Sequence, residues 1–264
     1  MNLEKICNQV RNLTITTGKY IRTESKNFKQ NNIEVKGLHD FVTHVDKASE
    51  KALVIGLSEI LPEAGFITEE KTINKTGEIY NWIIDPLDGT TNFIHSIPCF
   101  SISIALVENG IPILGVVYEI NLDECFYAWK DSPAYLNGTI IHVSEASTIA
   151  DSLIATGFPY YDYSKLNEYL DVFKYFLENS HGVRRLGSAA VDLAYVACGR
   201  FESFFEYSLH SWDVAAGAFI VQQAGGKVCD FKGGDDFIFG SEIIATNAAT
   251  YDEFMEIFKR ISGF

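Results

Sequence analysis

Apolar residues near the N-terminus recur every three or four positions, which places them on one face of a helix. These residues are Leu3, Ile6, Val10 and Leu13. The same periodicity returns after FVTHVD and predicts a second helix from about Lys47 to Ile60, which ends before Pro62. The chain therefore begins with two helices, separated by a stretch that Gly37 and His39 interrupt.

After the second helix the pattern changes to short apolar runs of the kind that form strands. The runs GFITEE (65–70) and IYNWIID (79–85) each end in acidic residues. Two more runs flank an Asn-Gly pair at 109–110, which is a strong hairpin signal, and another Asn-Gly pair follows at 137–138. We therefore expect an antiparallel-rich sheet within an N-terminal α+β half, residues 1–145.

From about residue 145 strands and helices alternate, which favours an α/β layered half over residues 146–264. Strands are expected at 152–158, 183–186, 200–207, 227–231 and 242–247, and helices at 165–180, 188–199, 212–226 and 251–261. The boundary falls near 143–150, where no linker rich in Pro, Ser or Gly is found. The two halves should therefore pack together directly.

The composition limits the functions that need to be considered. A chain of 264 residues with 47% hydrophobic residues can bury a sizeable core, as one large domain or two tightly joined ones. The net charge of −14 disfavours nucleic acid as a partner, because binding a phosphate backbone normally needs a basic face. No apolar run approaches 18 residues, so no membrane span is expected.

The five cysteines are odd in number, widely spaced and form no CxxC pair. This argues against a disulfide framework or a zinc site and suits a reducing compartment. The N-terminal segment is charged and polar at helical spacing, unlike a signal peptide. We therefore expect a cytoplasmic protein.

The candidate chemistry centres on the run WIIDPLDGTTNF, in which Asp85 and Asp88 follow large apolar residues. Pro86 keeps Asp85 out of helical geometry and breaks the strand ladder, so we expect a turn on which the two carboxylates converge. Gly89 permits close approach of a ligand, and Thr-Thr-Asn suits the first turn of a short helix with free N–H groups. Carboxylates for a hard cation beside N–H groups for a phosphate suit metal-assisted phosphate ester hydrolysis. The alternative is a plain turn with capping aspartates.

Other acidic residues add to this picture. Glu69 and Glu70 end the strand-like run before it, and Asp46 precedes a helix, where by itself it indicates an N-cap. Asp213 opens a helix that is almost entirely small and apolar, which indicates burial on most sides. A buried acid needs a partner, and a metal ion is a good one.

The combination of these motifs resembles the inositol monophosphatase family of lithium-sensitive, magnesium-dependent phosphatases. The resemblance rests on GFITEE, WIIDPLDGTTNF and WDVAAGAFIVQQAGG in that order, supported by ATGFPY and LGSAAVDLAYVACG. It implies a layered αβαβα sandwich of the sugar phosphatase type, a homodimer and inhibition by lithium.

The resemblance also implies two to three Mg²⁺ ions per site. The first ion matches Glu69, Asp85 and the backbone carbonyl of Leu87, and the second matches Asp85, Asp88 and Asp213. A third, weaker ion would share Glu69, and Glu70 matches a position that orients the cluster.

Further residues take their roles from the same resemblance. The phosphate would contact the N–H groups of Gly89 and Thr90, and Thr90 with Asp46 would position and activate the attacking water on the first metal. The substrate ring would contact Asp88, Ala189, Glu206 and Asp213. Lys36 matches a lysine that often precedes the DFVT-like segment, although its role is not fixed by the spacing.

The substrate expected from the resemblance is a small polyol or sugar phosphate, with inositol monophosphate as the default. Histidinol phosphate is the second choice, and fructose 1,6-bisphosphate and 3′-phosphoadenosine 5′-phosphate are further alternatives. A regulatory protein that keeps the fold and binds a partner is the non-enzyme alternative. A missing metal ligand would favour it, and none of the matched carboxylates is missing here.

Overall fold

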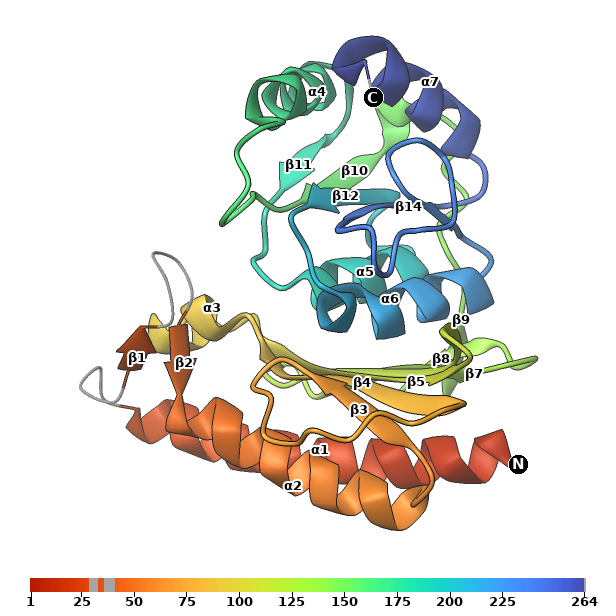
Figure 1. Ribbon diagram of the computed structural model, residues 1–264. Coiled ribbons are helices and arrows are strands. Elements are labelled where there is room, and N and C mark those ends of the chain that lie inside the picture. The colour runs from red at the N-terminus through yellow and green to blue at the C-terminus, as the bar shows by residue number, and fades with distance from the viewer. Residues whose placement is uncertain (29–32, 36–40, 264) are drawn as a thin grey trace.

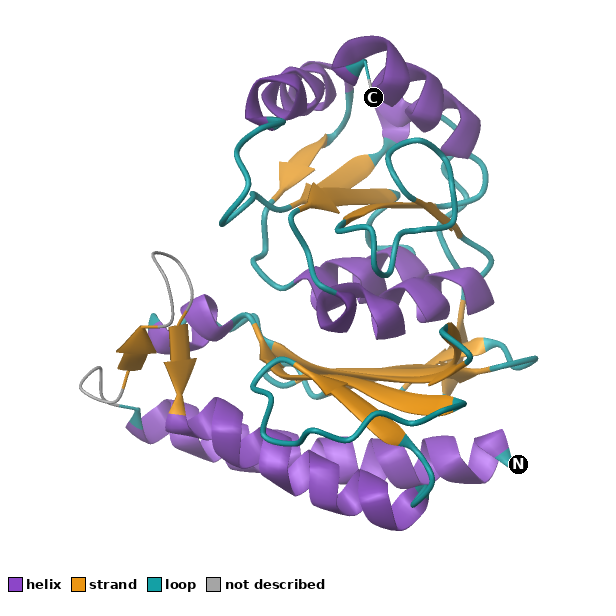
Figure 2. Cartoon of the chain, in the orientation of Figure 1, coloured by secondary structure: helices purple, strands orange, loops and turns teal. Residues whose placement is uncertain are grey.

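The computed structural model describes residues 1–28, 33–35 and 41–263 of the chain. These residues form five stacked layers, helix pair, sheet, helix pair, sheet and helix pair, which confirms the expected αβαβα sandwich (Figures 1 and 2). None of the helices among the described residues combines the length and the apolar character that crossing a bilayer requires.

The first two layers come from the N-terminal part of the chain. The outer helices are α1 (Leu3–Asn27) and α2 (His44–Ile60). The sheet holds seven strands in chain order, namely β3 (Gly65–Thr68), β4 (Tyr80–Asp88), β5 (Ser101–Glu108), β6 (Ile111–Glu119), β7 (Glu124–Trp129), β8 (Ala134–Leu136) and β9 (Thr139–Ile141). Only the β3–β4 pair of this sheet is parallel, so the expected antiparallel-rich sheet is confirmed.

The other three layers come from the C-terminal part. The central helices are α5 (Ala189–Ala197) and α6 (Ser211–Gln223), and the far outer helices are α4 (Leu166–Asn179) and α7 (Tyr251–Ser262). Between them lies a mixed sheet in the order β11 (Gly182–Arg184), β10 (Leu153–Thr156), β12 (Ser203–Tyr207), β14 (Glu242–Thr246) and β13 (Lys227–Cys229). We propose that the N-terminal half ends at residue 145 and the C-terminal half begins at residue 146. This boundary lies between β9 and the short 3-10 turn at Ile149–Asp151.

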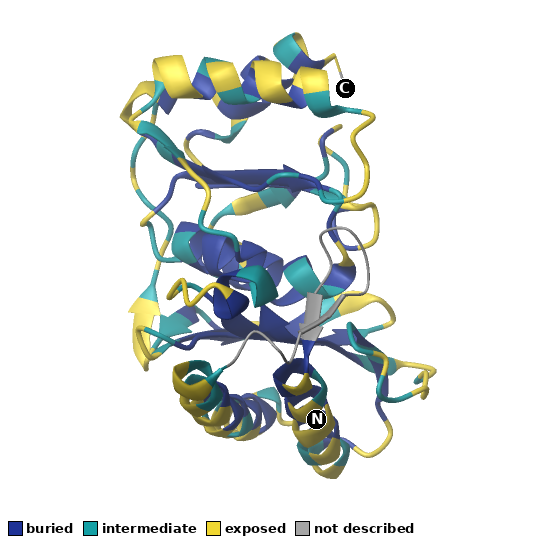
Figure 3. Ribbon diagram, turned by 90° about the vertical axis from the view of Figure 1, so that its left-hand side faces the viewer, coloured by how far each residue is buried: buried dark blue, intermediate teal, exposed yellow. Residues whose placement is uncertain are grey.

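The seven-stranded sheet is buried on both faces, and alternate residues of each strand serve different layers. In β4, Trp82 and Ile84 pack in the cluster between the sheet and the helices α1 and α2. Ile83 packs in the cluster around α5 and α6. Figure 3 shows that the central helices are mostly buried, while the outer helices present exposed residues to solvent. This explains why α5 and α6 lack a polar face.

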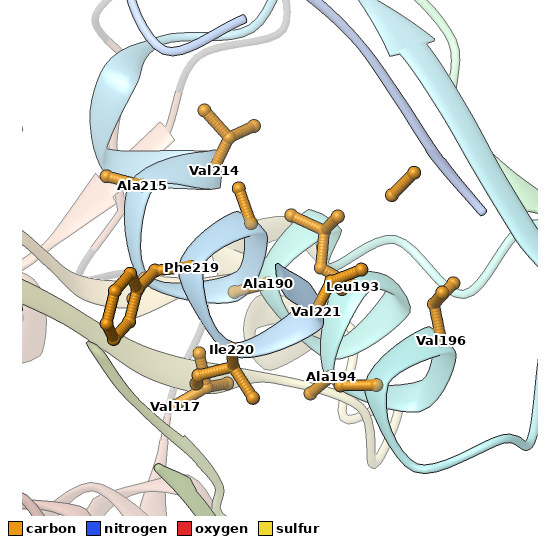
Figure 4. Close-up of a cluster of buried hydrophobic side chains, with 14 of the residues drawn as sticks. Val117, Ala190, Leu193, Ala194, Val196, Val214, Ala215, Phe219, Ile220 and Val221 are labelled. Carbon is orange, nitrogen blue, oxygen red and sulfur yellow. The ribbon is translucent and has the colours of Figure 1, made fainter. Parts of the chain in front are cut away.

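Small side chains allow the central layer to pack closely. Figure 4 shows apolar residues of α5 and α6 gathered with Val117 of β6 in one cluster. A Cβ added at Gly217 of α6 would lie 2.6 Å from the Cβ of Leu193 in α5. The alanine- and glycine-rich sequence of these helices therefore fixes their separation.

The second helix begins three residues earlier than predicted. Thr43 is its N-cap, because its hydroxyl oxygen accepts the N–H of Val45 at 3.1 Å. Asp46 is the third residue of the helix and accepts the N–H of Thr43 at 2.9 Å. The interpretation of Asp46 as the N-cap is therefore wrong, and Asp46 belongs to a capping box.

We expected the chain to leave the sheet at Pro86, but it does not. Strand β4 continues to Asp88 through a bulge, with Asp85 opposite Ser103 and Asp88 opposite Ser101. Pro86 is tolerated because it lies in the bulge, and because β3 pairs with β4 only as far as Ile84. A two-stranded ribbon of β1 (Ile33–Val35) and β2 (Phe41–Thr43) was not predicted.

Candidate functional site

A pocket of about 130 Å³ opens where the end of β4 meets the starts of α5 and α6. It contains all the predicted site residues except Asp46 and Glu70. The predicted residues that line it are Glu69, Asp85, Leu87, Asp88, Gly89, Thr90, Ala189, Glu206 and Asp213. Residues from both halves of the chain therefore form a single site.

Three carboxylates of this pocket converge on one point. Asp85, Asp88 and Asp213 each offer one carboxylate oxygen, and these three oxygens lie within 4.8 Å of one another. Asp85 and Asp88 flank the bulge of β4, and Asp213 is the third residue of α6, where its Oδ2 accepts the N–H of His210 at 2.7 Å. The bulge and the helix start thus produce the convergence.

Asp88 is held from the other half of the molecule. Its Oδ2 accepts hydrogen bonds from the Ser188 hydroxyl at 2.5 Å and the Ala190 N–H at 2.8 Å. These two donors belong to the N-cap and the first turn of α5. Asp88 therefore joins the seven-stranded sheet to the central helix layer, and it lies beside Ala189.

Burial and mutual repulsion destabilise the charged forms of these carboxyl groups in the metal-free protein. Burial raises the pKa of Asp88 to about 6, against the opposing hydrogen bonds from Ser188 and α5. Burial and then the Asp88 charge raise the pKa of Asp213 to about 7. The pKa of Asp85 is raised well above its usual range, by burial first and then by Glu69. The cluster has the charge and oxygen donors that fit a hard cation such as Mg²⁺.

The segment after the bulge forms the start of the short helix α3 (Thr90–Ile94). Gly89 has φ +93°, and an added Cβ would lie 3.0 Å from the Cys99 carbonyl oxygen, so a side chain is excluded there. Gly89 and Thr90 line the pocket at the helix start, where backbone N–H groups lack partners within the helix. This confirms the short helix expected after the two aspartates.

Thr90 connects the pocket to Asp46 behind it. The Thr90 hydroxyl lies 3.0 Å from Oδ1 of Asp46 and 2.9 Å from the carbonyl oxygen of Leu87. Asp46 is fully buried, and burial raises its pKa despite hydrogen bonds from Thr43 and Thr90. Asp46 therefore touches the pocket only through Thr90.

The pocket is also lined by residues that the sequence analysis did not select. Arg185 and Tyr160 are two of them, and the Arg185 guanidinium donates to the Tyr160 hydroxyl at 2.5 Å. Asp192 of α5 also lines the pocket, and Glu206 lies nearby with a pKa raised well above its usual range by burial, which the Arg185 charge opposes. Asp192 lies inside the motif LGSAAVDLAYVACG, which was its only sequence signal.

Glu70 does not line the pocket, and Lys36 lies outside the described residues. The backbone N–H of Glu70 donates to Glu50 at 2.7 Å. Glu50 is a fully buried residue of α2 that the sequence analysis did not select. The segment around Glu69 is therefore attached to α2.

Chemically, the pocket offers a carboxylate cluster for a cation, a helix start for an anion and polar groups for a hydroxylated molecule. Comparisons with known proteins agree with this arrangement. The model of the inositol monophosphatase family matches residues 2–262.

Individual relatives cover most of the chain. A protein of Neisseria meningitidis serogroup B named "Putative Nus factor SuhB" is 42% identical over 84% of this chain and 85% of its own. The "Inositol-1-monophosphatase" of Mesorhizobium japonicum is 38% identical over 81% of each chain. The solved structure of inositol monophosphatase from an Anabaena (Nostoc) species has a TM-score of 0.85 and 32% identity, covering 99% of this chain and 98% of its own. The chain is thus similar over at least 81% of its length to each of these proteins, and it belongs to the inositol monophosphatase family.

Proposed function

We propose that this protein hydrolyses a small polyol or sugar phosphate monoester with the help of Mg²⁺. The convergence of Asp85, Asp88 and Asp213 beside the start of α3 is the observation that carries the proposal. Inositol monophosphate is the default substrate, because a relative at 38% identity is named an inositol-1-monophosphatase. Histidinol phosphate, fructose 1,6-bisphosphate and 3′-phosphoadenosine 5′-phosphate are the alternatives to test.

The carboxylates would hold two to three Mg²⁺ ions. Glu69, Asp85 and the Leu87 carbonyl would bind one ion, Asp85, Asp88 and Asp213 a second, and Glu69 would share a third. When bound, Mg²⁺ neutralises the clustered charge, polarises the phosphate and lowers the pKa of a water molecule. Three clustered carboxyl groups with raised pKa values support this assignment, since a cation relieves their repulsion.

The remaining residues would bind and orient the substrate and the attacking water. The phosphate would lie against the backbone N–H groups of Gly89 and Thr90 at the start of α3. The Thr90 hydroxyl, which contacts Asp46, would accept a hydrogen bond from the attacking water and fix its direction. Because burial raises the pKa of Asp46, its carboxylate is suited to receive a proton passed through the Thr90 hydroxyl.

The polyol would lie in the part of the pocket that Glu206 and Asp213 line. Asp88, Ala189, Glu206 and Asp213 would contact the ring, with the Glu206 carboxylate as a hydrogen-bond acceptor for its hydroxyls. Water would be excluded from this part of the site by the substrate itself. The polyol, which is the leaving group of the hydrolysis, would therefore be selected by the geometry of its hydrogen bonds.

Phosphate release from the four candidate substrates, each measured with and without Mg²⁺, tests the proposal. We expect Mg²⁺-dependent release with a clear preference for one substrate. The result that would overturn it is a folded, Mg²⁺-binding protein that releases phosphate from none of them. Asp85→Asn is the control, since it removes a carboxylate shared by two ions.

The names of several relatives support a second candidate, a role as a Nus factor. The protein from Neisseria meningitidis carries that name at 42% identity. The net charge of −14 does not favour direct contact with RNA, so this role would require a protein partner. Retained partner binding by Asp85→Asn, together with no phosphate release by the unaltered protein, would favour this candidate over the phosphatase.

A further inference from the structure

The pocket wall that carries Glu69 is weakly held by the sheet. Glu69 follows the last residue of β3, and its N–H still reaches the Ile84 carbonyl at 3.3 Å. Beyond it, residues 71–77 have no regular secondary structure, and Lys71 adopts a left-handed backbone with φ +53°. A carboxylate on such a segment needs an anchor outside the sheet if it is to keep a fixed position.

Glu50 of α2 provides three hydrogen bonds to this segment. Its Oε1 accepts the Thr68 hydroxyl at 2.9 Å and the Thr72 N–H at 2.8 Å, and its Oε2 accepts the Glu70 N–H at 2.7 Å. Thr68 and Glu70 are the immediate neighbours of Glu69, and Thr72 follows three residues after it. Glu50 is fully buried, so water does not compete for these bonds.

The same helix also holds the other part of the site. Asp46 lies four residues before Glu50, which places the two carboxylates on one face of α2. Asp46 contacts the Thr90 hydroxyl at the start of α3, whereas Glu50 contacts the segment around Glu69. One rigid helix therefore fixes the distance between the two segments.

We propose that Glu50 is a positioning residue for the metal centre. By holding the Thr68 hydroxyl before Glu69 and the backbone N–H groups of Glu70 and Thr72 after it, Glu50 places the Glu69 carboxylate for a divalent cation. This inference rests on the proposed function, because it takes Glu69 to be a metal ligand. In this proposal, α2 keeps Glu69 at a fixed distance from Thr90.

The hydrogen-bond pattern requires a carboxylate at this position. A glutamine has one acceptor oxygen and one NH₂ group, and NH₂ can only donate. In either orientation of the amide, the NH₂ group would face a backbone N–H, of Glu70 in one case and of Thr72 in the other. Glu50→Gln therefore keeps the volume of the side chain but releases part of the segment.

The proposal is tested by measuring the affinity for Mn²⁺ in the absence of substrate, with electron paramagnetic resonance as the readout. Mn²⁺ takes the same oxygen ligands as Mg²⁺. We expect Glu50→Gln to bind Mn²⁺ about 10-fold more weakly or worse, the range seen when a group that orients a metal ligand is lost. Unchanged Mn²⁺ affinity in a folded Glu50→Gln protein would overturn the proposal.

Two controls separate positioning from general stability and from the metal assignment itself. Glu202→Gln alters another buried carboxylate, which accepts the Leu153 N–H at 2.6 Å and does not line the pocket, so Mn²⁺ affinity should remain unchanged. Asp85→Asn should abolish binding. If Asp85→Asn also binds Mn²⁺ normally, the proposed metal site has failed, whatever the result for Glu50→Gln.

Thr68→Val keeps the test decisive if Glu50→Gln does not fold. It removes one of the three hydrogen bonds and preserves a β-branched shape in β3. Mn²⁺ affinity should then fall by a smaller factor, about 2- to 5-fold, which corresponds to one net hydrogen bond. An affinity equal to that of the unaltered protein would overturn the proposal in this case too.

Discussion

Asp88 serves two neighbours, since it belongs to the carboxylate cluster and also accepts hydrogen bonds from Ser188 and Ala190. In Asp88→Asn the amide oxygen can still accept those hydrogen bonds, so the fold should be retained. The lost charge should reduce phosphate release by about 100-fold or more, because the second Mg²⁺ loses a ligand. Steady-state assays and circular dichroism check these outcomes. Near-normal activity with Mg²⁺ would show that the metal assignment is wrong.

Thr90 offers a test of water positioning that leaves the carboxylates intact. Thr90→Val removes the hydroxyl that contacts Asp46 and Leu87, with little change in shape. We expect kcat to fall by about 100-fold, as when a group that handles a proton is lost, with unchanged Mg²⁺ binding. Thr90→Ser retains the hydroxyl and should recover most of the activity. Equal loss in both variants would remove Thr90 from this role.

Glu206 is expected to determine which alcohol is accepted. Glu206→Ala should change the ratios of kcat/KM among polyol phosphates more than it changes Mg²⁺ affinity. The physical reason is that the buried carboxylate contributes to the wall of the pocket and not to the three-carboxylate cluster. The measurement is a substrate panel beside a Mg²⁺ titration. Equal losses on all substrates would exclude Glu206 from contact with the ring.

Individual residues differ in how well the sequence revealed them. Asp85, Asp88 and Asp213 could be selected because each stands where a local pattern ends or begins, at a strand end or a helix start. Glu50 occupies an ordinary position within a helix, and its partners near Glu69 are distant in sequence. Its role could not be predicted, because that role depends on tertiary contacts that leave no local pattern.

At the level of elements, α6 connects the site to the core. A Cβ added at Gly115 of β6 would lie 2.7 Å from the Ala216 carbonyl oxygen, so Gly115→Ala should push α6 away from the sheet. Overpacking of this kind costs about 1–3 kcal/mol of unfolding free energy. Because Asp213 begins the same helix, Mg²⁺ affinity should fall as well. Urea unfolding and Mg²⁺ titration check both effects.

Gly110→Ala is the matched control for that experiment. Gly110 has φ +82° and no atom within 4 Å of an added Cβ. The change should cost about 1 kcal/mol through backbone strain alone and leave Mg²⁺ affinity unaltered. If both glycine variants lose the same Mg²⁺ affinity, the contact between α6 and β6 does not position Asp213.

Strand boundaries were predicted less well than the order of elements. Pro86 indicated the end of a strand, but the structure places it in a bulge where its missing N–H removes no bond to β3. The ribbon of β1 and β2 has only three residues in each strand, too few for a periodic pattern. Long apolar runs such as α6 were predicted correctly, because burial on all sides dominates their composition.

For the whole molecule, the acidic cluster links stability to pH. In the metal-free protein the pKa values of Asp88 and Asp213 are raised from 3.8 to about 6 and about 7. Between pH 3.8 and about 7, the folded state therefore binds more protons than the unfolded state. The stability of the folded state falls as pH rises through this range. Mg²⁺ binds the deprotonated groups and should restore the lost stability.

Scanning calorimetry at pH 5 and pH 7.5, with and without Mg²⁺, measures this linkage. We expect the gain in Tm from Mg²⁺ to be larger at pH 7.5, where protonation of the cluster no longer competes with binding. Asp85→Asn should reduce the gain at both pH values. An equal gain at the two pH values in the unaltered protein would contradict the predicted coupling.

The central layer also affects how the chain is made. All strands of the seven-stranded sheet, which ends at Ile141, leave the ribosome before α5 and α6 are synthesised. Until then the face that includes Ile83, Val117 and Phe126 has no cover, although it is buried in the finished protein. A chain released early in this interval would expose an apolar sheet face and tend to aggregate. Translation therefore has to run through α6 before the first half of the molecule can become soluble.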